Sequence, residues 1–225
     1  MHISLIRTTT REGDVREFVF ETPHAFSWQA GQYLHYTLAH DADERGAERW
    51  FTISSAPSEH ELRITTRIDT QRGSSFKRAL CALQPGDTIQ IGEPEGDFTL
   101  QDPSRHYVFI AGGIGITPIR SILVEAAAQH IPLQATLLYA SRNEDIPFRD
   151  ELENLKDTLE HVEVEYIVEP RRLDDTLLRD TLAAHPHPLV YISGPEGMVR
   201  ALAAQVEKLG IASQDIKVDD FPGYE

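Results

Sequence analysis

The chain has 225 residues, of which 40% are hydrophobic and 25% charged, and its formal net charge is −15. This composition is that of an ordinary globular protein with one good core or two smaller ones. The negative charge argues against a nucleic-acid partner, because a phosphate backbone would repel it. No run approaches the roughly 20 apolar residues that cross a bilayer, and the N-terminus lacks the apolar region of a secretory signal. We therefore expect a cytoplasmic protein without membrane insertion.

A single cysteine, Cys81, is present. One thiol cannot form an internal disulfide, a zinc site or an iron–sulfur cluster, so redox chemistry would need a bound organic cofactor. The segment around Cys81 is apolar and helical in pattern, and we expect this side chain to be buried.

The first hundred residues predict many short strands punctuated by glycines, with one helix at 75–83 and an acidic hairpin loop at 39–48. This pattern indicates a small antiparallel barrel or sandwich. The predicted strands are 2–7, 15–21, 32–38, 50–54, 62–67 and 88–91.

From Tyr107 onward, strands alternate with helices, which indicates a parallel sheet covered on both faces. We place the boundary near Asp102, giving domains 1–102 and 103–225, the second ending in a short tail. The predicted strands are 107–111, 133–140, 162–168, 189–193 and 216–218, and the predicted helices are 118–129, 148–159, 175–184 and 196–209.

A glycine-rich turn, residues 112–115, follows the first strand of this second half. Thr117 is predicted as the N-cap of the next helix, with Pro118 at its first position. Glycines let a pyrophosphate approach the backbone, and a helix N-terminus offers free N–H groups. The turn therefore favours a dinucleotide site, although a tight turn without a ligand is the alternative.

Two further strand ends carry candidate ligand contacts. Ser141 and Arg142 follow the second strand of this half, and a hydroxyl with a guanidinium suits a 2′-phosphate better than a diol. This favours NADP(H), unless Arg142 instead pairs with Glu144 or Asp145. Ser193 ends the fourth strand, at the edge where open parallel sheets bind ligands, and a simple connection without a ligand is the alternative.

The segment Arg49-Trp50-Phe51-Thr52-Ile53-Ser54-Ser55 is a candidate flavin site. An arginine can bind a pyrophosphate bidentately, Phe51 can face a flat heterocycle, and Thr52 can hydrogen-bond a ring nitrogen. A second place for phosphate contacts is Gly73-Ser74-Ser75, where a helix begins. The first segment alone is typical of an edge strand, but the second anion site and the dinucleotide domain that follows favour a flavin.

In this order, these motifs resemble the ferredoxin–NADP reductase family of flavoproteins over nearly the whole chain. The family's Arg-x-Tyr-[Ser/Thr]-x-x-Ser corresponds to residues 49–55, its Gly-Gly-x-Gly-x-[Thr/Ser]-Pro to 112–118, and its Cys-Gly-Pro-x-x-Met to 193–198. Phe51 and Ser193 depart from the usual tyrosine and cysteine. The resemblance implies a six-stranded antiparallel β-barrel that binds FAD and an α/β domain that binds NADP(H) or NAD(H), with no iron–sulfur domain attached.

The resemblance further implies an enzyme in which a hydride passes from NAD(P)H to flavin N5 and electrons leave for a ferredoxin, a flavodoxin or a small acceptor. We expect a monomer or weak oligomer. A candidate basic patch for an acidic carrier consists of Arg63, Arg67, Arg72, Lys77 and Arg78. One alternative is a flavin-bearing electron-transfer or regulatory subunit without productive NAD(P)H turnover, and another is a nucleotide-binding module without flavin.

We expect Thr52, Ser193 and Phe221 to act at the reacting centre, with Phe221 rather than Tyr224 covering the flavin. The residues expected to contact the two cofactors are Arg49, Trp50, Phe51, Thr52, Ser55, Arg67, Gly73, Ser74, Ser75, Gly113, Gly115, Thr117, Pro118, Ser141, Arg142, Gly194, Pro195, Met198 and Tyr224.

Overall fold

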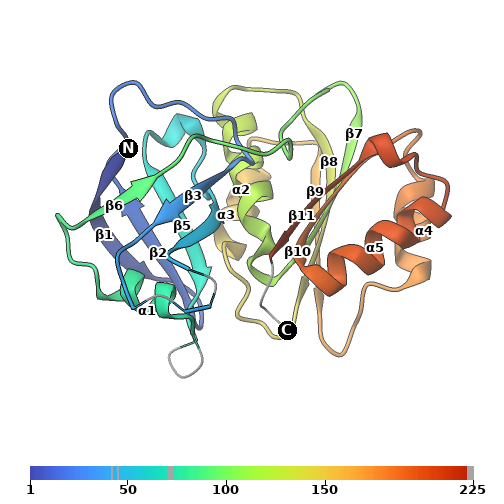
Figure 1. Ribbon diagram of the computed structural model, residues 1–225. Coiled ribbons are helices and arrows are strands. Elements are labelled where there is room, and N and C mark those ends of the chain that lie inside the picture. The colour runs from blue at the N-terminus through green and yellow to red at the C-terminus, as the bar shows by residue number, and fades with distance from the viewer. Residues whose placement is uncertain (42, 45, 70–72, 222–225) are drawn as a thin grey trace.

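The computed structural model describes residues 1–41, 43–44, 46–69 and 73–221. Two β-sheets lie side by side, one built from the N-terminal half and one from the C-terminal half (Figure 1). Among the described residues, no helix has the length and apolar character needed to cross a membrane.

The N-terminal sheet is antiparallel throughout and has the strand order β4-β3-β6-β1-β2-β5. It curves around a core in which Phe18, Leu34, Tyr36 and Ile53 are completely buried. The helix α1 (Ser75–Ala82) adds Phe76 to this core. The strands are β1 (His2–Thr10), β2 (Val15–Phe20), β3 (Tyr33–Thr37), β4 (Glu48–Thr52), β5 (Leu62–Arg67) and β6 (Thr88–Ile91), and the short helix η1 (Pro57–Glu59) follows β4.

The C-terminal sheet is parallel throughout and has the strand order β11-β10-β7-β8-β9. The chain starts at β7 in the middle and builds outward in both directions, so the switch point where ligands bind in such sheets lies beside β7. The strands are β7 (His106–Gly112), β8 (Gln134–Ser141), β9 (Val162–Val168), β10 (Leu189–Pro195) and β11 (Ile216–Phe221).

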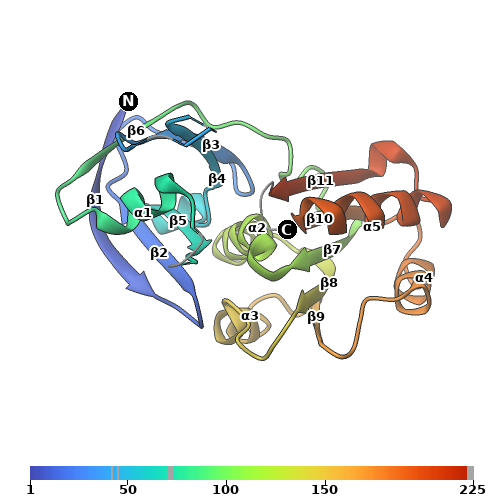
Figure 2. The same cartoon turned by 60° about the horizontal axis from the view of Figure 1, so that its bottom comes forward.

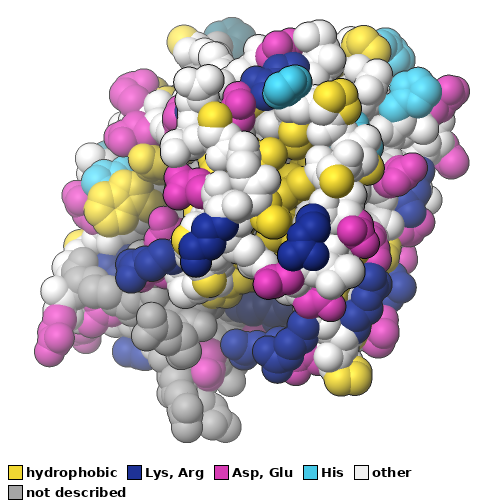
Figure 3. Space-filling view, turned by 90° about the vertical axis from the view of Figure 1, so that its right-hand side faces the viewer, with side chains coloured by type: hydrophobic (Ala, Val, Ile, Leu, Met, Phe, Trp, Pro, Cys, Tyr) yellow, Lys and Arg dark blue, Asp and Glu magenta, His cyan; other side chains and the backbone are white. Residues whose placement is uncertain are grey.

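Helices cover both faces of the parallel sheet (Figures 1 and 2). The face toward the barrel carries α2 (Ile116–Ala128) and α3 (Arg149–Leu155), and the other carries α4 (Asp175–Ala183) and α5 (Glu196–Lys208). Burial on both faces explains why β7 is almost continuously apolar. Figure 3 shows the α4–α5 side, where acidic and basic side chains are interspersed. The remaining short helices are η2 (Gly113–Gly115) and η3 (Ser213–Asp215).

The helix α2 fastens the two halves together through polar contacts with the segment that follows β4. Arg120 Nη1 donates to the Ser54 carbonyl oxygen at 3.0 Å, and Ser121 Oγ donates to the Ser55 carbonyl oxygen at 2.7 Å. This helix begins directly after the glycine-rich turn, so its docking also sets the position of that turn relative to the barrel.

The predicted two-domain architecture is confirmed, but two local predictions are wrong. The helix α2 begins at Ile116 because η2 runs straight into it, so Gly115 rather than Thr117 precedes the helix. Thr117 Oγ1 instead donates to the Ile114 carbonyl oxygen at 3.1 Å. Cys81 is exposed, because α1 turns Phe76 and Leu80 toward the core. The predicted boundary at 102/103 falls in the connection between β6 and β7 and stays a prediction.

Candidate functional site

Three strands bring their ends together where the two sheets meet. Thr52 is the last residue of β4, Ser193 lies near the end of β10, and Asp219 is its direct partner on β11. Thr52 Oγ1 donates to Asp219 Oδ2 at 3.4 Å. Thr52 and Ser193, which were predicted to act together, therefore lie close to the same carboxyl group, that of Asp219.

The electrostatics of this place are set by burial. The pKa of the Asp219 carboxyl is raised to about 7, mainly by burial. The hydroxyl groups of Thr52 and Ser193 act to lower this pKa, and the nearby charge of Asp220 acts to raise it. Ser193 is completely buried, and its Oγ makes no hydrogen bond within normal distance among the described residues. A buried hydroxyl without a partner among the described residues and a carboxyl with a pKa near neutrality therefore lie close together where the two sheets meet.

Two glycines of the turn at 112–115 are required by packing within the protein. A Cβ atom at Gly112 would lie 2.5 Å from Met198 Sδ, and one at Gly115 would lie 2.3 Å from the Ser193 carbonyl oxygen. These glycines allow the turn to press against the end of β10 and the start of α5. The predicted residues Gly194, Pro195 and Met198 belong to this packing, and Pro195 immediately precedes α5.

Gly113 differs from its neighbours, because a Cβ atom there would make only ordinary contacts. Its φ is +54°, and a Cβ atom there would lie 3.9 Å from Arg67 Nε, the nearest side-chain atom. Arg67, which ends β5 and pairs with Asp14 at 2.5 Å, thus brings a cation from the barrel to the glycine-rich turn. The turn is open at the one glycine that a dinucleotide phosphate would approach.

An anion already occupies the predicted phosphate contacts of the barrel. Arg49 Nη2 lies 2.5 Å from Asp43 Oδ1, and Ser75 Oγ donates to Asp43 Oδ2 at 3.0 Å. Ser74 caps α1 by accepting from the Lys77 N–H at 3.3 Å. The carboxylate of Asp43 stands in for a phosphate between the arginine and the start of α1, so this donor set fits the diphosphate of FAD. Gly73 is held close to this turn, because a Cβ atom there would lie 2.4 Å from the Asp69 carbonyl oxygen.

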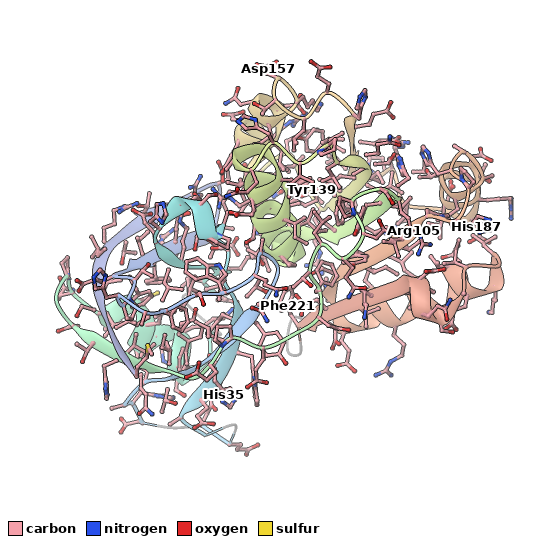
Figure 4. The ribbon with its side chains drawn as sticks, turned by 90° about the horizontal axis from the view of Figure 1, so that it is seen from above. His35, Arg105, Tyr139, Asp157, His187 and Phe221 are labelled. Atoms are coloured by element: carbon pink, nitrogen blue, oxygen red, sulfur yellow. The ribbon has the colours of Figure 1, made fainter. Side chains whose placement is uncertain are left out.

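The aromatic residues of β4 point in opposite directions, as alternate residues of a strand do. Phe51 packs against Tyr36 with ring centroids 5.8 Å apart. Trp50 is 58% exposed and packs on His35, which lies on the barrel side of the molecule (Figure 4). The structure therefore separates Trp50 from Phe51. Ser55 is buried, and its hydroxyl donates to the Glu61 carbonyl oxygen at 2.6 Å.

The strand ends that carry Ser141 and Phe221 lie near the same edge of the parallel sheet. Ser141 is buried, and its Oγ has no partner among the described residues. Arg142 is exposed and makes no ion pair with any described residue, whereas Glu144 pairs with Arg149 at 2.7 Å. Phe221 ends β11 and lies between the two halves of the molecule in Figure 4. Tyr224 lies outside the described residues.

The prediction of a basic surface patch is wrong for one of its residues, Arg63. Arg63 is buried and forms ion pairs with Glu59 and Glu61, each at 3.1 Å, so it presents no charge to the surface. Lys77 and Arg78 line a hollow together with Arg16. Arg72 lies outside the described residues.

Asp219 is the site residue that the sequence prediction missed. The last strand was expected to end at Val218, but it continues to Phe221 and carries Asp219 into register with Ser193. The signal was the pair of acidic residues between Val218 and Phe221, which fits a strand whose inward side chain meets a polar site. No cluster of three or more potential metal ligands occurs among the described residues.

Comparison with known proteins decides the family. The family model described as "Oxidoreductase NAD-binding domain" matches residues 109–204. Ferredoxin–NADP reductase B of Sorangium cellulosum is 29% identical over 230 residues, which cover 92% of this chain and 91% of that protein. The chain is a flavoprotein reductase of the ferredoxin–NADP reductase-like type.

Other relatives of this chain are longer. The carnitine monooxygenase reductase subunit of Escherichia coli is 32% identical over 184 residues, which cover 80% of this chain and 55% of that protein. The flavohemoglobin of Malassezia yamatoensis, a structure with bound FAD and heme, has a TM-score of 0.79 at 25% identity and covers 98% of this chain and 59% of that one. The chain thus spans about half the length of several curated relatives that it matches.

Proposed function

We propose that this chain is an FAD-dependent NAD(P)H oxidoreductase that passes electrons to a separate acceptor. The observation that carries the proposal is the contact between Thr52 and Asp219, because it joins the end of the candidate flavin strand to the crevice of the nucleotide-binding sheet. A flavin along β4 and a dihydronicotinamide at the ends of β7 and β10 would meet at this contact. Proximity of the two reactants is the main requirement of hydride transfer between cofactors.

FAD suits the barrel, because Arg49 and Ser75 hold one anion between them where the family resemblance puts the flavin diphosphate. When bound, FAD supplies a two-electron acceptor that can release electrons singly. Phe51 would face the flat ring, and Phe221, at the end of β11, is placed to cover its other side. Family relatives support this assignment, since the flavohemoglobin of Malassezia yamatoensis binds FAD.

The polar residues at the domain junction would donate and accept protons. With a pKa of about 7, the Asp219 carboxyl holds a proton in a fraction of molecules at neutral pH. Thr52, the last residue of the candidate flavin strand, donates its hydroxyl to Oδ2 of this carboxyl, so it would link Asp219 to a flavin bound along that strand. Ser193 Oγ, which has no hydrogen-bond partner within normal distance among the described residues, can orient a carboxamide or a ring edge.

The preferred coenzyme of the proposal is NADPH. Arg142 is exposed, and the structure shows no ion pair between it and another described residue. A guanidinium without a protein partner beside the buried Ser141 suits the 2′-phosphate. The Arg142→Ala variant should therefore lose kcat/KM with NADPH about tenfold, with NADH almost unchanged. An equal loss for both coenzymes would remove the argument for the phosphate.

The acceptor is proposed from the relatives and from the surface. Relatives named as ferredoxin–NADP reductase or as reductase subunits suggest a protein carrier such as a ferredoxin, a flavodoxin or an oxygenase component. A hollow lined by Arg16, Lys77 and Arg78, and by one carboxylate, Asp69, would give this acidic chain a local excess of positive charge for such a carrier. We also propose a cytoplasmic location, where NADPH and such carriers are available.

An absorbance experiment tests the proposal. The purified protein should bind FAD with a flavin spectrum, and NADPH added without oxygen should bleach it. Bound flavin that no pyridine nucleotide bleaches would instead favour an electron-transfer or regulatory subunit without NAD(P)H turnover. A protein that refuses FAD would leave a nucleotide-binding module.

A further inference from the structure

Tyr139 connects the two segments to which the coenzyme is assigned. Its side chain is completely buried within β8 and is labelled in Figure 4 beside α2. The hydroxyl donates to the Gly113 carbonyl oxygen at 2.9 Å, and the Pro147 carbonyl oxygen also accepts from it at 3.3 Å. We propose that Tyr139 is a positioning residue that holds the glycine-rich turn and the segment after β8 in one relative geometry for the coenzyme. This inference rests on the proposed function.

The first segment depends on such support at Gly113, because its backbone has a conformation that favours glycine. Its φ is +54°, and no side chain packs closely against it. Its carbonyl oxygen accepts from the Ile116 N–H, which starts α2, as well as from Tyr139. These two donors fix the plane of the peptide that follows Gly113 and so the direction of the N–H group offered to a phosphate.

The second segment, which follows β8, is exposed at its start, where it would meet the coenzyme, and buried at its end. Residues 142–145 are exposed, whereas Ile146, Pro147 and Phe148 are buried. The Tyr139 hydroxyl holds the buried end at Pro147, two residues beyond the exposed part. Arg142 therefore lies on a short span between a strand end and a fixed backbone position.

The buried end of this segment is also tied to the barrel. Phe148 has a φ of +63°, which bulky residues rarely adopt. Its ring contacts the guanidinium of Arg11, with 4.8 Å from the Arg11 Cζ to the ring centroid, and that of Arg120, at 5.6 Å. A change at Pro147 would therefore be felt at the domain junction, which is why one hydroxyl can influence the placement of the whole coenzyme.

The chemistry of the hydroxyl suits this role. Burial raises the pKa of Tyr139 well above its usual value, so the group stays a neutral donor at all working pH values. Replacing it by phenylalanine keeps the ring and leaves two carbonyl oxygens without this donor, at the cost of about one hydrogen bond.

The chain offers a matched control in the same domain. Tyr191 is also completely buried in the parallel sheet, and its hydroxyl donates to a backbone carbonyl oxygen, that of Thr99, at 2.8 Å. Thr99 belongs to the connection between the sheets and to neither coenzyme segment. Tyr191→Phe thus loses the same kind of hydrogen bond, to a carbonyl oxygen that lies in neither coenzyme segment.

The experiment measures NADP⁺ binding to the FAD-loaded protein by calorimetry, with thermal unfolding alongside. Tyr139→Phe should raise the Kd about fivefold or more, and Tyr191→Phe less than about twofold, at similar losses of Tm. Equal Kd values for Tyr139→Phe and the wild type, or equal increases in both variants, would overturn the inference. Wild-type protein that binds neither NADP⁺ nor NAD⁺ would instead refute the proposed function, and the inference with it.

A double-mutant cycle tests whether one hydroxyl serves both segments. In the Arg142→Ala background the second segment contributes less to coenzyme binding. The fold-increase in Kd caused by Tyr139→Phe should therefore be smaller there than in the wild type, by a factor of about three or more. Strictly additive effects would show that the hydroxyl supports the glycine-rich turn alone and would refute its role in joining the two segments.

Discussion

Thr52 and Asp219 are separated by 167 positions in the chain, yet Thr52 Oγ1 lies 3.4 Å from Asp219 Oδ2. Each residue ends or nearly ends a strand of a different sheet. The contact exists because α2 fixes the barrel against the parallel sheet. It also requires that β11 continues far enough along β10 for Asp219 to pair with Ser193. A titratable carboxyl is thereby placed where the two proposed cofactors would meet.

Replacing Asp219 by asparagine should remove a pH dependence of turnover. Since burial raises the pKa of this carboxyl to about 7, the protonated form dominates below that pH and is lost above it. Wild-type kcat should therefore fall as pH rises through about 7, and Asp219→Asn should show a flat profile with kcat reduced about tenfold or more. Steady-state kinetics with NADPH across this range, beside the neighbouring variant Asp220→Asn, provide the measurement. A wild-type-like profile in Asp219→Asn would contradict the assignment.

Removing the Arg120 side chain should weaken the junction between the domains. This arginine is 2% exposed, contacts the carboxylates of Glu59 and Glu151, and donates to the Ser54 carbonyl oxygen. Arg120→Met leaves Glu151 without its cation and Glu59 with Arg63 alone, which should cost about 3 kcal/mol of unfolding free energy. Denaturant unfolding measures this cost, and Arg200→Met, in an exposed pair with Glu196, is the control.

The same experiment separates charge from packing. Adding Glu59→Gln to Arg120→Met removes one of the two carboxylate charges that Arg120 offset, so the double variant should recover part of the lost stability. If the double variant is less stable than Arg120→Met by the full cost of Glu59→Gln alone, the ion pair is not what the arginine contributes.

The sequence predicted most of the architecture because each half carries a strong periodic signal. The alternation of strands and helices after Tyr107 fixes a parallel sheet, and the glycine-rich turn with Pro118 locates its ligand edge. What failed were properties that depend on packing. Thr117 looked like a cap, but the continuous turn η2 moved the start of the helix, and Cys81 looked apolar, but α1 turned it outward.

The site was predictable in part for a related reason. Thr52 and Ser193 follow local patterns that can be read from single segments, whereas Asp219 acquires its role only from strand register and burial. Arg63 shows the reverse case. This charged residue of a basic stretch was expected at the surface, but it is buried and forms ion pairs with three glutamates, Glu17, Glu59 and Glu61. Tertiary ion pairs leave no mark in a linear pattern.

Neutralising Asp43 should tighten FAD binding. Its carboxylate occupies Arg49 and Ser75, the donors assigned to the flavin diphosphate, so FAD must displace it. Asp43→Asn weakens this internal competitor and should lower the FAD Kd about threefold or more, whereas Arg49→Ala should raise it at least about tenfold. Fluorescence titration of the deflavinated protein measures both. Weaker FAD binding by Asp43→Asn would mean that the carboxylate supports the flavin-binding shape of Arg49 instead of competing for it.

Protonation of His106 should destabilise the fold in mild acid. Its ring stacks on that of His185 with centroids 3.4 Å apart, and the Nε2 atoms of both lie near Thr136 Oγ1, at 3.0 and 3.4 Å. Burial and the proximity of His185 lower the pKa of His106 to about 4 from an ordinary value of 6.5. The folded state thus binds this proton less readily than the unfolded chain, so its contribution to stability is present above pH 6.5 and lost as pH falls toward 4.

His106→Asn removes this titration and should lose less Tm than the wild type between about pH 7 and pH 5. The exposed residue His24 provides the control, since His24→Asn should follow the wild type throughout. Thermal unfolding at several pH values gives the comparison, and the difference between His106→Asn and the wild type, rather than either Tm alone, carries the result. Parallel losses in all three proteins would assign the acid sensitivity to the many carboxylates of this chain and not to the stacked pair.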